Sequence, residues 1–247
     1  MHRSHVWLLL VAAALAGGGA CDLFGEDLLS WDFALPEKEF TVNTDNFVPA
    51  AIKQLQPATM PTIACPTVDC CAGLAASECD TFGFACQTGA CVAVPSVELS
   101  NSLNLAQEVP QLQSVASNIP SFTHVTLKRL YLASYSNTLN YDTPEIEIYL
   151  GPEAAASVDD VDQGGAPLCQ KLGRLDPIPK GTSCLAGCAG LDVVLEPAAA
   201  QVFETFVRNF RQTFKLFVRA TSQFEPGDPV PAGQFTATVT GTVTASM

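Results

Sequence analysis

Basic residues are scarce in this chain of 247 residues. Twelve lysines and arginines stand against 25 aspartates and glutamates, which gives a formal net charge of −13. Nucleic-acid binders neutralise phosphates with basic residues gathered on one face, so the composition argues against a nucleic-acid partner. The chain is 48% hydrophobic and only 15% charged. Because disordered chains are less apolar and more highly charged, we expect a folded protein with a sizeable core.

Catalytic motifs are also missing. Only one histidine, His124, lies beyond the first five residues. The chain has no G-x-S-x-G elbow, no phosphate-binding loop and no C-x-x-C motif. Glu145 and Glu147 lie two residues apart on a predicted strand, so both side chains fall on one face. Their position on a solvated sheet face accounts for these charges without catalysis. We therefore expect a protein that is not an enzyme, and a hydrolase using His124 is the enzymatic alternative.

The apolar run at the N-terminus spans residues 6–16, which is shorter than the roughly 20 residues needed to cross a bilayer. It follows Arg3, and the small residues 17–20 separate it from Cys21. Residues 1–21 resemble a bacterial lipoprotein signal, from which they depart at Gly18, where that family usually has leucine. The resemblance implies that residues 1–20 are removed and that Cys21 carries acyl chains such as palmitate. These chains would hold the protein at a membrane of the cell envelope, facing the periplasm or the exterior.

Ordinary secretion is the competing interpretation of the same segment. Residues 14–16 (Ala-Leu-Ala) form an A-x-A cleavage site, and cleavage there would release a protein with an unmodified Cys21. The cysteine count favours this alternative, because the ten cysteines can form five pairs whereas nine remain without Cys21. We favour the lipoprotein, and which membrane it occupies stays open.

Strand patterns dominate the rest of the chain. The clearest is residues 235–245, where apolar or small residues alternate with threonine. Similar patterns predict about seven strands in all, the others lying at 40–42, 97–99, 125–135, 145–150, 191–195 and 214–221. Two helices are expected, at 107–117 and at 197 to about 210. The final threonine-faced strand is a candidate sheet edge.

These elements predict a mainly β fold: a two-layer antiparallel β-sandwich of Ig-like or Greek-key type, with one or two short helices and a small disulfide-rich insert. We divide the chain into a signal peptide (1–20), a tether or lead-in (21–36) and a sandwich domain (37–247). A cysteine-rich insert (57–94) interrupts that domain.

The insert contains six cysteines within 27 residues: Cys65, Cys70, Cys71, Cys79, Cys86 and Cys91. It has too few apolar side chains to build a core of its own, and modules this small usually need disulfides or a metal. Behind an export signal, disulfides are the expected solution, because zinc sites favour C-x2-C or histidine ligands. The doublet Cys70-Cys71 should pair outward in two directions. We expect the insert to project as a separate small lobe.

Two further groups are candidate sites. Cys169, Cys184 and Cys188 should contain one disulfide, and the third cysteine would pair elsewhere or stay free. The acidic segment 157–165 carries Asp159, Asp160 and Asp162 beside glycines, which makes it a weak candidate Ca²⁺ site, since Ca²⁺ prefers oxygen ligands in flexible turns. No other cofactor is expected.

The sequence thus predicts an exported, lipid-anchored protein of the cell envelope with a binding or structural role. Its partners would be the membrane, through Cys21, and an envelope protein or polysaccharide. A secreted, unlipidated β-sandwich binding protein is the alternative.

Overall fold

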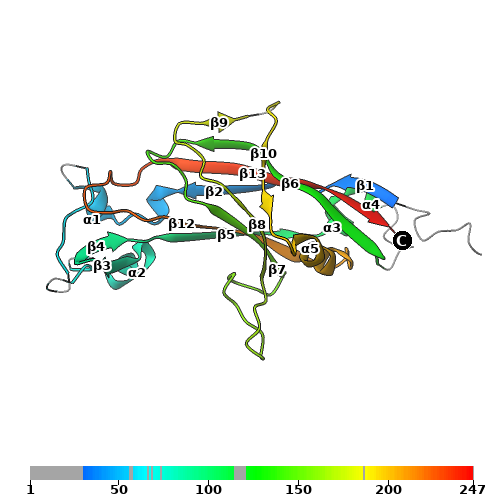
Figure 1. Ribbon diagram of the computed structural model, residues 1–247, viewed down its shortest axis with the longest axis horizontal. Coiled ribbons are helices and arrows are strands. Elements are labelled where there is room, and N and C mark those ends of the chain that lie inside the picture. Colours follow the sequence, from blue (N-terminus) through cyan, green and yellow to red (C-terminus); the bar gives the residue numbers. More distant parts are fainter. Residues whose placement is uncertain are drawn as a thin grey trace, which may run out of the picture.

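The computed structural model describes residues 30–55, 58–65, 67, 69–72, 74–113, 121–185 and 187–246. The predicted signal peptide and Cys21 lie outside these residues. Within them, two large antiparallel sheets and a two-stranded sheet are accompanied by a few short helices (Figure 1). The prediction of a mainly β chain with antiparallel sheets, few helices and several disulfides is confirmed.

The first sheet is built around its two longest strands, β13 (Gln234–Ser246) and β6 (His124–Asn137), which pair along their whole length. On the other side of β13, β1 (Ser30–Ala34) and β2 (Lys38–Asn43) pair with successive parts of that strand. The short strands β9 (Ser183–Cys184) and β10 (Leu191–Asp192) pair with β6.

Two expectations are wrong here. The threonine-faced strand β13 is central in its sheet rather than at an edge, because β1 and β2 cover the side away from β6. The sheet also begins at Ser30, inside the segment 21–36 that we expected to be a tether. The side chain of Phe33 in β1 is buried in the core, which explains why this part of the segment is folded.

The second sheet has five strands in the order β11, β8, β7, β12 and β5. Its members are β5 (Ser96–Leu103), β7 (Ile146–Pro152), β8 (Gln170–Leu175), β11 (Val194–Leu195) and β12 (Phe214–Thr221). The predicted strand 191–195 is therefore two strands, β10 and β11, in different sheets. The chain crosses between the sheets at Val193, whose side chain is buried.

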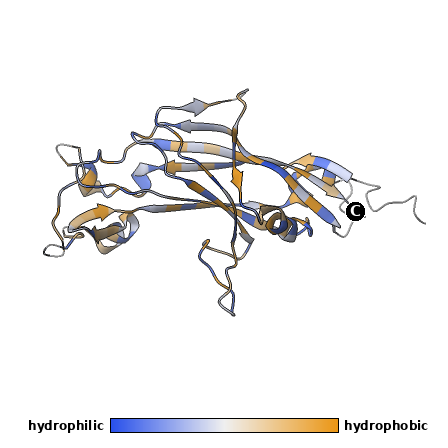
Figure 2. Cartoon of the chain, in the orientation of Figure 1, coloured by the Kyte–Doolittle hydropathy of each residue, from blue (hydrophilic) through white to orange (hydrophobic). Residues whose placement is uncertain are grey.

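One hydrophobic core lies between the two large sheets. Hydrophobic and hydrophilic residues alternate along the long strands, as Figure 2 shows, so each strand turns one face inward. Phe235 and Val239 of β13 contribute to the same buried cluster as Ile148 of β7 and Leu216 of β12. Burial of these alternating positions is the main stabilising contribution to the body of the protein.

A helix closes one end of this core. The predicted helix beginning near residue 197 is α5 (Ala199–Val207), which buries Phe203 and Val207, and the chain then switches to strand at β12 as expected. The predicted helix 107–117 is instead two short turns, α3 (Leu105–Glu108) and α4 (Pro110–Gln113). Val109 between them is extended, because a residue before proline is disfavoured in the α conformation. Residues 114–117 lie outside the described part.

The cysteine-rich segment contains the two-stranded sheet. It contains α2 (Ala76–Phe82) and a hairpin of β3 (Phe84–Gln87) and β4 (Ala90–Ala93); η1 (Thr44–Asn46) and α1 (Ala50–Lys53) precede it. We call residues 58–94 the cysteine lobe. Figure 1 shows the lobe at one end of the long axis, with β1 and the end of β13 at the other.

The lobe is not held by disulfides alone, contrary to our expectation. Phe82 of α2 is fully buried and belongs to a hydrophobic cluster that also includes Phe47 and Phe224 of the body. The rings of Phe82 and Phe224 stack with centroids 6.5 Å apart. Two backbone hydrogen bonds between Ala93 and Phe224 join β4 to the body. The lobe is therefore docked on the sandwich rather than projecting separately.

In the described part of the chain, no helix has the length and apolar character needed to span a bilayer.

Candidate functional site

Three disulfides cross-link the cysteine lobe. They join Cys65 to Cys86, Cys70 to Cys91 and Cys71 to Cys79. The neighbours Cys70 and Cys71 thus pair in two directions, as predicted. Cys86 and Cys91 lie opposite each other in the β3–β4 hairpin, so two of the bridges fasten that hairpin to the segment before α2.

The remaining cysteines behave differently from one another. Cys184 and Cys188 form a fourth disulfide, which closes a small loop beside β6. Cys169, which we considered a disulfide candidate, is unpaired and buried. It packs with Ala155, Val158 and Phe217 beneath the acidic segment. Burial, reinforced by the nearby carboxylates of Asp160 and Glu98, raises the pKa of the Cys169 thiol to about 11, so the thiol stays protonated and unreactive at neutral pH.

The acidic segment leaves the sheet after β7 and returns to it at β8. Its backbone is fastened to the edge strand β5, since a Glu98 carboxylate oxygen accepts a hydrogen bond from the Val158 amide at 3.1 Å. The ammonium of Lys215 in β12 donates to the Ala155 carbonyl at 2.8 Å. These contacts hold the segment over Cys169.

The three aspartates of this segment are engaged separately. Asp159 forms an ion pair with Arg219 at 2.9 Å. Asp160 accepts hydrogen bonds from the amides of Ala156 and Ser157, which lower its pKa. Asp162 accepts from the amides of Gly164 and Ala166. The structure therefore does not bring the proposed Ca²⁺ ligands together around one point.

Among the described residues, one group of three or more cysteine, histidine or acidic ligand atoms lies within 4.8 Å of one another: Cys65, Cys70 and Cys91. All three sulfur atoms are already in disulfides.

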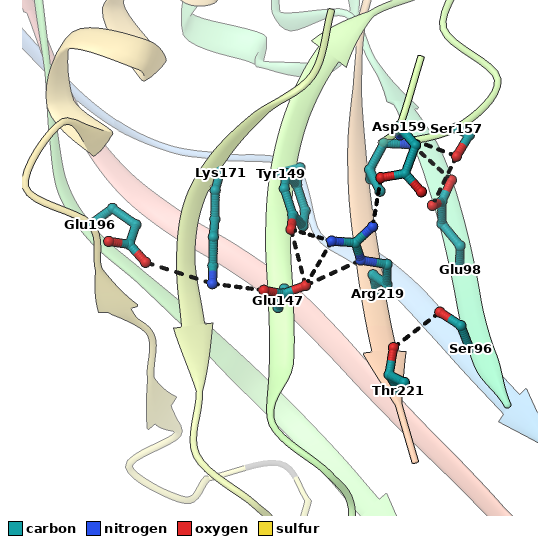
Figure 3. Close-up of polar contacts among 11 residues, drawn as sticks. Ser96, Glu98, Glu147, Tyr149, Ser157, Asp159, Lys171, Glu196, Arg219 and Thr221 are labelled. Carbon is teal, nitrogen blue, oxygen red and sulfur yellow. Dashed lines mark hydrogen bonds and ion pairs between the residues drawn. The ribbon is translucent and has the colours of Figure 1, made fainter. Parts of the chain in front are cut away.

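A charged cluster lies on the outer face of the five-stranded sheet, around Glu147 of β7 (Figure 3). One Glu147 carboxylate oxygen accepts from the ammonium of Lys171 at 2.8 Å, and the other accepts from the Arg219 guanidinium at 3.1 Å and the Tyr149 hydroxyl at 3.0 Å. Lys171 also lies 3.7 Å from Glu196, and Arg219 is the residue that binds Asp159. We call Glu147, Tyr149, Lys171 and Arg219 the Glu147 cluster.

Electrostatics keep the cluster in fixed ionisation states. Partial burial acts to raise the pKa of Glu147, but hydrogen bonds from Lys171, Tyr149 and Arg219 outweigh it and hold the pKa below its usual value. The hydrogen bond to Glu147 raises the pKa of Lys171 in turn. Glu147 is thus an ionised carboxylate whose two oxygens already accept hydrogen bonds. It is poorly suited to donate a proton near neutral pH. The neighbouring Glu145 pairs with Arg174 at 2.8 Å.

His124 is the first residue of β6, and its side chain is 65% exposed. Its Nδ1 lies 3.7 Å from a carboxylate oxygen of Glu204 in α5. Glu204 is also bound by Arg208, whose hydrogen bond lowers the pKa of Glu204. His124 therefore lies at an open surface beside an ion pair.

The sequence patterns did not predict that the four residues of the Glu147 cluster lie together. The alternation in β7 placed Glu145 and Glu147 on the solvated face, but Lys171 comes from β8, a strand that we did not predict. The register of β7 against β8 and β12 brings the four side chains together.

Comparison with known proteins identifies no family. No protein-family model matches the chain, and no curated protein matches it. Among solved structures it is similar to turnip yellow mosaic virus, with 11% identity over 63% of this chain and 80% of that chain, at a TM-score of 0.22. Tobacco necrosis virus is similar at 12% identity, over 74% of this chain and 90% of that chain, at a TM-score of 0.17. Scores this low assign no function.

Proposed function

We propose that the protein is an exported component of the cell envelope, anchored by lipid on Cys21, with a binding or structural role and no enzymatic activity. Its partners would be the membrane at the anchored end and an envelope polysaccharide or protein at the other. Its function would require no cofactor and would not depend on Ca²⁺ at the acidic segment.

The pairing of the cysteines is the observation that carries this proposal. Four disulfides use eight of the nine cysteines that follow Cys21. The ninth, Cys169, is only 4% exposed and lies beneath the acidic segment. Five disulfides would require Cys21 to reach this buried thiol. The even count of ten cysteines therefore no longer favours simple secretion, because Cys169 is buried without a disulfide partner, and Cys21 would be available for acylation.

The position of β1 supports the same proposal. Ser30, the first described residue, lies opposite Ser246 in the first sheet. Their strands, β1 and the end of β13, lie at the end of the molecule away from the cysteine lobe (Figure 1). An anchor nine positions before Ser30 would leave the cysteine lobe far from the membrane and free to meet a partner.

Two further observations favour a role without catalysis. The carboxylate of Glu147 has its acceptors filled and its pKa lowered, so it resembles a structural ion-pair centre. His124 is exposed beside Glu204 and Arg208 rather than enclosed with a nucleophile. A hydrolase using His124 stays the alternative, and abolition of a measured hydrolytic activity by His124→Ala would support it.

We further propose that the body is an Ig-like or Greek-key sandwich. Consecutive strands cross repeatedly between the two large sheets. Along the chain, β5 lies in the five-stranded sheet, β6 in the first sheet and β7 in the five-stranded sheet again; β12 also lies in the five-stranded sheet, and β13 in the first. Such crossings are typical of Greek-key connections.

Mass spectrometry of the protein expressed with its own N-terminus in a bacterial host tests the anchor. We expect a mature N-terminal Cys21 carrying a thioether-linked diacylglycerol, and Cys21→Ser should move the protein from the membrane fraction to the soluble fraction. Cys169→Ser is the matched control, since it removes the cysteine that is unpaired among the described residues and should leave the fractionation unchanged. A mature chain that begins before Cys21, with that cysteine unmodified, would overturn the proposal.

A further inference from the structure

A cleft of about 510 Å³ is lined by residues of the body, one of which, Phe224, pairs through its backbone with Ala93 of the cysteine lobe. Three loops line it, those that follow β6, β8 and β12. We call it the distal cleft, because it lies toward the end of the molecule opposite the predicted anchor. The residues that line it are Asn140, Tyr141, Asp142, Pro144, Lys180, Ser222, Gln223, Phe224, Asp228 and Pro229. Its volume falls in the range of small-ligand sites.

The half-buried Tyr141 ring and the prolines Pro144 and Pro229 give the distal cleft apolar walls, and Phe224, which is 5% exposed, backs the tyrosine. The Tyr141 ring meets the Phe224 ring edge-on, with centroids 5.0 Å apart. Burial raises the pKa of Tyr141, although a hydrogen bond with Ser222 acts in the opposite direction. The tyrosine hydroxyl therefore remains a hydrogen-bonding group at neutral pH.

The rim of the cleft supplies both hydrogen-bond acceptors and hydrogen-bond donors. Asp142 uses one carboxylate oxygen to accept the Lys180 amide at 2.9 Å, and Asp228 uses one to accept the Glu225 amide at 2.8 Å. These bonds fix both carboxylates and leave the second oxygen of each as an acceptor. Lys180 and Gln223 are exposed and add donors.

This combination indicates the class of ligand. Sugar rings present hydroxyls at their edges and C–H groups on their faces, so they suit apolar walls with acceptors and donors at the rim. Two carboxylates against one lysine disfavour an anion. We propose that the distal cleft binds a neutral oligosaccharide segment. The inference rests on the proposed function in so far as it names the polysaccharide as the partner.

A second cleft of about 500 Å³ provides an internal comparison. It lies near segment 230–234 and is lined by Asn43, Thr44, Asp45, Lys53, Ala58, Thr138 and residues 230–234. It matches the distal cleft in size and also has a lysine and a carboxylate, but no aromatic ring lines it. We expect the sugar at the distal cleft and not here.

The cysteine lobe holds one wall of the distal cleft in place. Phe224 exchanges two backbone hydrogen bonds with Ala93, of 3.0 and 2.8 Å, and its ring stacks on Phe82. Phe82 ends α2, the helix that Cys79 ties to Cys71. Disulfides in the lobe should therefore shape a binding site that contains no cysteine.

Calorimetric titration of the full mature chain with cellotetraose, maltotetraose and fully N-acetylated chitotetraose tests the proposal. We expect at least one of these neutral sugars to bind at one site per chain. Asp142→Ala and Gln223→Ala should each weaken that binding, Asp142→Ala by about tenfold, as expected for loss of a hydrogen bond to a charged group. Lys53→Ala in the second cleft should leave the affinity unchanged, and reduction of the disulfides should weaken it.

Failure of all three sugars to bind would overturn the inference, as would equal binding by the wild type and both cleft variants. Binding of a basic peptide but of no sugar would also overturn it. These outcomes are separate from the anchor test: an unmodified Cys21 leaves sugar binding untouched, and absence of sugar binding leaves the lipid on Cys21 untouched.

Discussion

The body and the cysteine lobe solve the problem of stability in different ways. The body buries a continuous hydrophobic cluster between two sheets, and no described disulfide crosses it. The lobe has three disulfides within residues 65–91 and contributes few fully buried side chains, Phe82 and Ala93 among them. A segment of this size cannot exclude enough water on its own, so cross-links that restrict its unfolded state replace part of the core.

Disulfide cross-linking and apolar burial act together at the contact between the lobe and the body. Phe82 packs on Phe224, and Ala93 pairs with the same residue, so the cross-linked segment completes its packing on the body. Disulfides shape the lobe, and apolar burial attaches it. Variants that remove one contribution at a time should separate these two effects.

Removal of a large side chain from the core of the body should have the largest effect. Phe210 is fully buried and stacks on Phe122 with centroids 4.7 Å apart. We expect Phe210→Ala to lower the free energy of unfolding by about 3–5 kcal/mol. Urea titration in the presence and absence of reductant measures this change. A loss that appears only under reducing conditions would contradict the division between body and lobe.

Removal of a lobe disulfide should come next. Cys65–Cys86 closes a loop with a sequence separation of 21, and its replacement by two alanines should cost about 3 kcal/mol of local stability. Hydrogen exchange should rise in β3 and β4 and stay low in β6 and β13. Replacement of Cys184 and Cys188, whose separation is 4, is the control and should cost less. Equal exchange increases in β13 would show that the body depends on the lobe.

A conservative change at the junction should have a smaller effect. Phe82→Leu keeps an apolar side chain but reduces the area of contact with Phe224. We expect the free energy of unfolding to fall by about 1–2 kcal/mol. The amide of Ala93, which donates to Phe224, should exchange faster while the lobe disulfides remain intact. Unchanged protection of that amide would argue that the disulfides alone position the lobe.

The Glu147 cluster should contribute least, and only above acidic pH. The pKa of Glu147 is lowered from 4.5 in the fold, so the ionised carboxylate stabilises the native state above that pH and the contribution disappears as the pH falls through the lowered value. We expect Glu147→Gln to cost about 1 kcal/mol at neutral pH and less in acid. Glu145→Gln, at the more exposed pair with Arg174, is the control and should cost less than about 0.5 kcal/mol. Thermal melts as a function of pH measure both variants, and a larger effect of Glu147→Gln in acid would contradict the assignment.

Local sequence patterns predicted the elements whose environment is regular. Alternation identified β7, β12 and β13 because each turns one face into the core along most of its length. β8 was missed because Gly173 interrupts a six-residue strand whose polar residues include Lys171 and Arg174. A Cβ at Gly173 would lie 2.5 Å from the Val194 carbonyl oxygen, so the glycine permits the close approach of β11.

Long-range contacts account for what the sequence did not reveal. The doublet Cys70-Cys71 correctly predicted outward pairing, but no local pattern indicated that Phe224 would complete the packing of Phe82. The Glu147 cluster and the distal cleft likewise depend on strand register and loop positions. The aspartates 159, 160 and 162 resembled a cation site in composition, yet the fold supplies each with its own amide or guanidinium partner.

The pairing of Ser30 with Ser246 has a practical consequence. Because the two ends of the folded domain meet, a short linker would join them and allow a circular permutant to be opened elsewhere, for example in the acidic segment. In such a permutant the new termini would leave from the side of the molecule, so a fused reporter would occupy neither the predicted membrane end nor the tip that carries the cysteine lobe.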